Sequence, residues 1–154
     1  MEHERTVPQD RLAVDVSLLL VRIIVGVIFA AHGAQKLFGV WDGPGLAGIT
    51  APPPDGMGFM GYLVTIGEFF GGLGLIVGLL TRFSAASLIV IMIGAIALVH
   101  GKNGFFQSDN GFEYNLALIG LLLPILICGS GRFSIGRLLM PRSAKSEQPI
   151  IILE

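Results

Sequence analysis

Two ionisable residues lie inside long apolar stretches of this sequence, where a charged side chain is energetically unfavourable. Glu68 is the only ionisable residue of the run 58–80, and Arg22 is the only one of the run 16–31. A charged group in hydrocarbon is costly unless it faces protein or water, so both are candidates for a functional site. In the alternative interpretation, Glu68 is a structural hydrogen-bonding group between helices and Arg22 extends to the lipid headgroups.

Further polar residues flank the apolar runs. His32 and Lys36 follow the first run, His100 follows a third, and Glu113 and Tyr114 begin a fourth. Histidine, lysine and tyrosine donate hydrogen bonds to carbonyl oxygens, and a carboxylate can relay protons. Two histidines and two carboxylates also suit a transition metal, but the sequence has no HxxxH or ExxH spacing, and we predict no metal site.

The elements that must position these residues are membrane helices. Of the 154 residues, 53% are hydrophobic and 14% charged, with a mean hydropathy of +0.76. Four apolar runs, 16–31, 58–80, 83–99 and 112–128, are long enough or nearly long enough to span a bilayer, and they lack the period-two alternation of barrel strands. We therefore predict an all-α integral membrane four-helix bundle at 16–139, with an N-terminal tail at 1–15 and a C-terminal tail at 140–154. Pro124 should bend the fourth helix rather than end it.

The positive charges predict an orientation. If both termini share one face, Lys36 and Lys102 are alone on the other. The first face then carries Arg5, Arg11, Arg82, Arg132, Arg137, Arg142 and Lys145, with Arg22 just inside it. The positive-inside rule therefore predicts that both termini, and both tails, are cytoplasmic. The N-terminal segment has no small-residue cleavage site and does not resemble a removable signal peptide.

This topology brings the polar residues to similar depths. Because only Thr81 and Arg82 separate the second and third runs, we expect these helices to be antiparallel neighbours. At 1.5 Å per residue, Glu68 lies about 10 Å below the outer end of its helix, and Arg22 about as far above the inner end of its own. We therefore expect His32 or Lys36, rather than Arg22, to pair with Glu68.

Glycine is abundant, with 22 residues, and small residues allow membrane helices to approach closely. In the second run they form a stripe of Gly67, Gly71, Gly74 and Gly78, and in the first a stripe of Gly26, Ala30 and Gly33. We expect these two stripes to pack against each other. Alternatively, the glycines simply reflect the frequency of this residue in membrane helices.

Four ordered segments resemble a known family. HGAQKLFG at 32–39, GEFFGGLGLIVGLLTR at 67–82, HGKNGFFQSDNGFEYNL at 100–116 and GSGRFSIGRLL at 129–139 are similar to the DoxX family of small bacterial membrane proteins. The resemblance implies a multi-pass inner-membrane protein of four helices, of a kind commonly named an oxidoreductase or quinone-linked redox subunit. It implies that the family's recurrent polar positions are His32, Lys36, Glu68, Arg82, His100, Glu113 and Tyr114.

The sequence departs from this family pattern twice. Gly136 stands where relatives often have an aspartate, so no carboxylate role is expected there. The prolines at 52–54 oppose a helix where relatives often place a short amphipathic segment, which puts in doubt a lid or partner surface there.

Several functions are excluded by composition. A net charge of −1 offers no basic surface for nucleic acid, and a single cysteine provides no CxxC pair. There is no GxGxxG unit after a strand. A bound quinone fits better, in a subunit of a membrane redox complex, with Glu68 the best candidate for a catalytic residue and with membrane or periplasmic redox proteins as partners. The alternative is a non-catalytic membrane anchor or scaffold for partner proteins; either role is compatible with a homo-oligomer.

Overall fold

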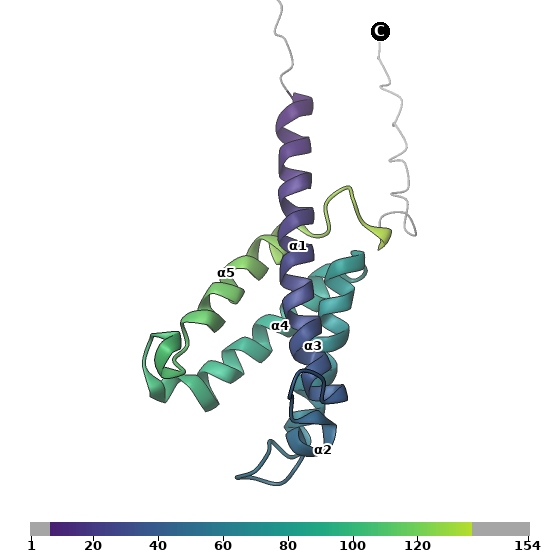
Figure 1. Cartoon of the computed structure of the whole chain (residues 1–154). Coiled ribbons are helices and arrows are strands. Elements are labelled where there is room, and N and C mark those ends of the chain that lie inside the picture. The colour runs from purple at the N-terminus through teal and green to yellow at the C-terminus, as the bar shows by residue number, and fades with distance from the viewer. Residues whose placement is uncertain (1–6, 137–154) are drawn as a thin grey trace, which may run out of the picture.

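A computed structural model describes residues 7–136 of the chain, and within this range every regular element is helical (Figure 1). The α-helices are α1 (Val7–Phe38), α2 (Gly45–Ile49), α3 (Phe59–Val77), α4 (Thr81–Ala95) and α5 (Glu113–Cys128). A π-helix, Ile96–His100, extends α4, and 3-10 turns occupy Gly101–Asn103 and Gln107–Asp109. The predicted C-terminal tail and the cationic residues Arg5, Arg137, Arg142 and Lys145 lie outside the described residues.

The predicted membrane fold is confirmed at the level of fold class. Helical stretches Arg11–Phe38, Phe59–Val77 and Thr81–Asn103 are long and apolar enough to cross a membrane. The fourth, α5, is equally apolar but has 16 residues, about 24 Å at 1.5 Å per residue. Pro124 lies inside α5 without ending it, as predicted.

The first helix is longer than its apolar run. α1 begins at Val7 instead of residue 16, so residues 7–15 of the predicted tail are helical. Pro8 is compatible with this start because the N–H groups of the first helical turn have no partner within the helix, so the N–H that proline lacks is not needed there. In the loop before α3, the prolines at 52–54 are not helical, as predicted, but the short α2 precedes them.

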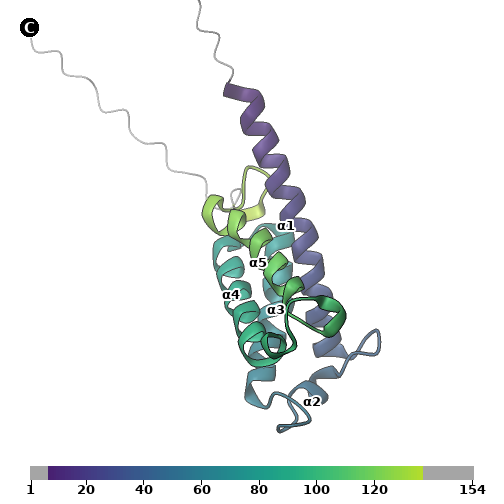
Figure 2. The ribbon, with the colours of Figure 1, turned by 90° about the vertical axis from the view of Figure 1, so that its left-hand side faces the viewer.

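The helices form two hairpins that meet at one end. α1 packs antiparallel to α3, and α4 packs against α5, while the short turn after α3 makes α3 and α4 neighbours, as predicted. Figure 1 shows the α4–α5 hairpin diverging from α1 and α3 toward the 100–112 loop, and Figure 2 shows the same helices from the side. Fully buried side chains of all four long helices fill the region between them: Val25, Phe29, Leu75, Leu88 and Leu122.

The predicted pairing of the two glycine stripes is wrong. Gly67, Gly71 and Gly74 face α4, where an added Cβ atom would meet side-chain atoms of Ile91, Leu88 and Ser84 respectively. The α1 stripe instead packs on the backbone of α3. A Cβ at Gly72 would lie 2.5 Å from the backbone nitrogen of Ala30, and one at Gly33 would lie 2.4 Å from that of Phe69. Because α3 lies between two helices, it presents two smooth faces, and the sequence pattern does not assign either face to a neighbour.

A hydrogen-bonded clasp joins the hairpins at the end where they meet, which we call the closed end. The Arg22 guanidinium donates to the carbonyl oxygens of Ser130 and of Phe133, the latter at 2.5 Å. The Gly136 amide donates to the Gly78 carbonyl at 3.2 Å, and a Cβ at Gly136 would lie 2.8 Å from that oxygen. Arg22 is 2% exposed, so the interpretation that it extends to the headgroups is wrong.

Candidate functional site

A pocket of about 530 Å³ lies where the hairpins diverge, and residues of α1, α3, α4, its π-helical extension and α5 line it. Its polar and ionisable lining residues are His32, Lys36, Glu68, His100, Gln107, Tyr114 and Asn115. Five of these were predicted site residues, from four separate segments of the sequence. The pocket therefore gathers most of the predicted polar set at one depth of the bundle.

The pocket contains a buried ion pair. Lys36, in the last turn of α1, donates its ammonium Nζ to Oε2 of Glu68 on α3, and the two side chains are 21% and 5% exposed. Lys36 is one of the two partners, His32 or Lys36, that the depths of the residues predicted for Glu68. The Lys36 ammonium compensates a carboxylate that would otherwise be unpaired in an apolar wall.

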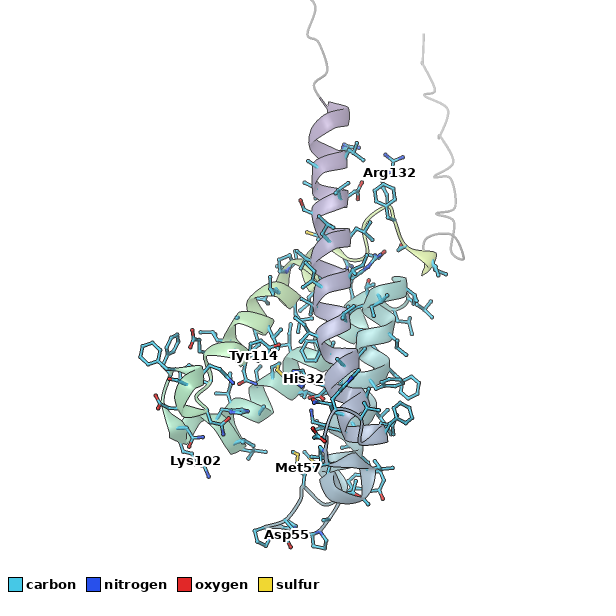
Figure 3. The ribbon with its side chains drawn as sticks, in the orientation of Figure 1. His32, Asp55, Met57, Lys102, Tyr114 and Arg132 are labelled. Atoms are coloured by element: carbon cyan, nitrogen blue, oxygen red, sulfur yellow. The ribbon has the colours of Figure 1, made fainter. Side chains whose placement is uncertain are left out.

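His32 and Tyr114 form an aromatic pair at the wall of the pocket. Their ring centroids are 6.3 Å apart and their planes are inclined by 62°, an edge-to-face contact between α1 and α5. Figure 3 labels both residues. His32 lies one helical turn before Lys36, so the two side chains share a face of α1. One wall of the pocket thus carries an imidazole and an ammonium, with a phenol opposite the imidazole.

The π-helix positions His100 at the edge of the pocket. Its Nδ1 lies 2.9 Å from the carbonyl oxygen of Asn110, and because a carbonyl only accepts, Nδ1 must carry the proton. In the neutral form of the ring, this places the acceptor lone pair on Nε2. Single π turns within α-helices are frequent at functional sites, and this one ends on a pocket residue.

Asn115 is a pocket residue that the sequence did not single out. Its side chain is buried in α5, and Nδ2 donates to the sulfur of Met92 at 3.4 Å, a weak acceptor. Asparagine at the polar start of a helix is ordinary in a sequence. The only available signal was its position beside Tyr114.

Three predicted site residues lie outside the pocket. Glu113 is exposed, and its Oε2 accepts the Gln107 amide at 3.0 Å, so it orders the 100–112 loop. Arg22 and Arg82 are at the closed end, where Arg82 donates to the Ile127 carbonyl at 2.8 Å. Among the described side chains of residues 11–136, no group of three or more His, Cys, Asp or Glu residues is placed to hold a metal ion.

The pocket opens sideways through an apolar edge. Met60 and Leu63 on α3, and Val90 and Leu98 on α4 and its extension, line the pocket and are also exposed on the outside of the bundle. In a bilayer such side chains face hydrocarbon. The pocket thus has an apolar edge that continues onto the outer surface of the bundle.

The fold and pocket define a multi-pass helical membrane protein with a partly buried ion pair beside a cavity that has an exposed apolar edge. Comparison with known proteins places it more narrowly. The DoxX family model matches residues 17–101, and the chain belongs to the DoxX family.

Three curated relatives resemble most of the chain. "Uncharacterized membrane protein Rv3486" of Mycobacterium tuberculosis is 30% identical, over 82% of this chain and 83% of its own length. "Putative oxidoreductase CatD" of Bacillus subtilis is 32% identical, over 72% and 79%. "Inner membrane protein YqjF" of Escherichia coli is 34% identical, over 81% and 93%. No solved structure gives a significant match to the chain.

Proposed function

We propose that the pocket binds a membrane quinone and that the protein is a quinone-linked membrane subunit of an oxidoreductase. The observation that carries this proposal is the Lys36–Glu68 pair at the wall of an apolar pocket that opens toward lipid. A lipid-soluble carrier of electrons and protons needs such a combination of hydrocarbon access and ionisable groups.

The residues of the pocket fit a quinone. Its volume of about 530 Å³ is within the usual range of small-molecule sites, about 300–1,000 Å³. Lys36, His32 and Tyr114 supply hydrogen-bond donors for a ring carbonyl, and Asn115 lines the same cavity. Met60, Leu63 and Val90 at the open edge suit an isoprenoid tail.

A quinone supplies two-electron chemistry in which each reduced oxygen takes up a proton. Lys36 would hold a carbonyl oxygen by its ammonium, which the hydrogen bond to Glu68 orients. When the quinone is reduced, the Lys36 ammonium would give a proton to the oxygen that it holds. Glu68 would then return a proton to the Lys36 amine, because the two groups share a hydrogen bond. His32 and Tyr114 would position the ring between α1 and α5.

The relatives support this assignment and its cellular setting. The Bacillus subtilis relative is named an oxidoreductase, and the Escherichia coli relative an inner membrane protein. We propose that this protein likewise lies in the inner membrane of a bacterium, with both termini cytoplasmic, because the closed end carries most of the arginines. Its electron donor would be a partner protein of the same membrane or of the periplasm.

The test compares two glutamate-to-glutamine changes. The purified wild type, Glu68→Gln and Glu113→Gln proteins are assayed for co-extracted quinone and for binding of a short-chain ubiquinone. Glu113 is the matched control because it lies near the same end but outside the pocket. We expect Glu68→Gln to lower quinone affinity about tenfold, the effect of one charge-assisted hydrogen bond, and Glu113→Gln to change it little.

Equal quinone binding by all three folded proteins would overturn the proposal. Such a result would favour the alternative role, an anchor for partner proteins, in which the ion pair is structural.

A further inference from the structure

A second cavity lies at the closed end and shares no residue with the pocket. This groove, of about 710 Å³, lies between α1, the α3–α4 turn and the segment after α5. Its polar side chains include Arg82, Asp15 and Ser130, and its apolar ones include Val14, Leu80 and Phe83. The quinone proposal gives this groove no role.

Arg82 brings spare hydrogen-bond donors to the groove. Its Nη2 donates to the Ile127 carbonyl at 2.8 Å, which uses one of five N–H bonds, and no carboxylate within residues 11–136 lies within ion-pair distance of it. Thr81, Arg82 and Phe83, in the first turn of α4, line the same groove. A guanidinium held by a carbonyl at one side and free at the other is suited to an anion with several oxygens.

Positive charge dominates the closed end. Its described segments, 11–22, 78–83 and 128–136, contain four arginines (Arg11, Arg22, Arg82, Arg132) and one carboxylate, Asp15. Asp15 lines the groove, and its Oδ1 accepts the Arg132 amide at 2.9 Å. Arg22, buried beneath the segment 130–133, contacts carbonyl oxygens rather than a carboxylate, so its full charge adds to the field there.

The apolar rim of the groove indicates what carries the anion. Leu80 and Phe83 are 63% and 71% exposed, and Val14 is exposed beside them. A small soluble anion gains nothing from contact with these apolar side chains. The acyl chains of a lipid bound by its headgroup would pack on them. Basic pockets between membrane helices near the bilayer surface are known to select anionic headgroups.

We propose that the groove binds the phosphodiester headgroup of an anionic membrane lipid. Arg82 donates from its free N–H groups to the phosphate oxygens, and Leu80 and Phe83 contact the acyl chains. Occupancy bridges the α3–α4 turn and the segment after α5, and so it strengthens the clasp between the two hairpins.

The experiment measures stabilisation by lipid of the purified full chain in detergent. The thermal unfolding midpoint is followed as phosphatidylglycerol, phosphatidylcholine or inorganic phosphate is added, in wild type, Arg82→Gln, Arg82→Lys and Asp15→Asn. Lys102→Gln is the matched control, because Figure 3 places Lys102 at the far end of the α4–α5 hairpin from Arg132 of the closed end. Each midpoint shift is referred to that variant's own lipid-free value, so a loss of basal stability does not obscure binding.

We expect phosphatidylglycerol to raise the midpoint more than phosphatidylcholine does, with an apparent affinity about tenfold lower in Arg82→Gln and unchanged in Lys102→Gln. Arg82→Lys should lose part of the affinity because an ammonium cannot form the paired bonds of a guanidinium. Asp15→Asn keeps an acceptor for the Arg132 amide but removes the negative charge, so it should bind the anionic lipid more tightly. Equal affinities in Arg82→Gln and Lys102→Gln, or an equal shift with phosphatidylcholine, would overturn the proposal. A full shift with inorganic phosphate alone would overturn the assignment to lipid.

Discussion

Lys36 of α1 and Glu68 of α3 are 32 positions apart and form the one salt bridge among the side chains described, those of residues 11–136. The pair joins α1 and α3 next to Gly33, where an added Cβ atom would lie 2.4 Å from the Phe69 backbone nitrogen, so a close approach of the two helices and the ion pair occur at adjacent levels. Close packing of the helices thus makes it possible for a lysine near the membrane surface to reach a carboxylate within it.

Substitutions of Lys36 and of Glu68 should have non-additive effects on the free energy of unfolding. Lys36→Met leaves the Glu68 carboxylate unpaired and should lower the free energy of unfolding by about 2 kcal/mol, less than for a fully buried pair because Lys36 is partly exposed. Adding Glu68→Gln should recover part of this loss, with a coupling energy of about 1–3 kcal/mol. Unfolding in mixed micelles measures the cycle, with Lys102→Met as control. Strictly additive losses would show that the residues do not interact.

The two tyrosines of the chain offer a matched pair of variants. Tyr114 lines the pocket opposite His32, whereas Tyr62 lies on the exposed side of α3 and does not line it. Under the quinone proposal, Tyr114→Phe should weaken quinone binding roughly three- to tenfold through loss of one hydrogen bond, and Tyr62→Phe should not. Titration with a short-chain ubiquinone measures both. A loss in Tyr62→Phe alone would place the ligand elsewhere.

The contact between α1 and α3 should tolerate no added methyl group. A Cβ at Gly72 would lie 2.5 Å from the Ala30 nitrogen and 2.7 Å from the Gly26 oxygen, both backbone atoms that cannot move alone. Gly72→Ala should therefore destabilise the bundle by about 1–3 kcal/mol. Gly120→Ala on α5 is the control, because a Cβ there meets nothing within 4 Å. Thermal unfolding compares the two variants, and equal stability would contradict this helix packing.

Removal of Arg22 should open the clasp at the closed end. Arg22→Met loses two hydrogen bonds from a charged donor, each contributing about 1.5–3 kcal/mol. Amide hydrogen exchange should then quicken at Gly136 and Arg132, whose amides are bonded across the clasp. Arg11→Gln, at an exposed position of α1, should leave both amides protected. Unchanged exchange in Arg22→Met would mean that the segment 129–136 is held without it.

Helix positions and depths were largely predictable, because a bilayer demands long apolar runs and because 1.5 Å per residue converts sequence position into height. This is why Lys36 could be expected to meet Glu68. The glycine stripes were assigned to the wrong neighbours because a helix packed on two sides has two smooth faces, and spacing alone does not say which helix contacts which. Asn115 was missed for a similar reason, since its burial depends on how α5 is rotated against α4.

From the sequence alone followed a membrane helical bundle, its approximate spans, and a polar set gathered toward one end, since hydropathy and spacing are local properties of the chain. Only the tertiary structure decided that the two hairpins diverge around a pocket with an exposed apolar edge, that Arg22 closes the opposite end on backbone carbonyls, and that Glu113 lies outside the site. The physical reason is that rotation of each helix about its axis and the angle between hairpins depend on contacts between segments far apart in the chain, which no local pattern encodes.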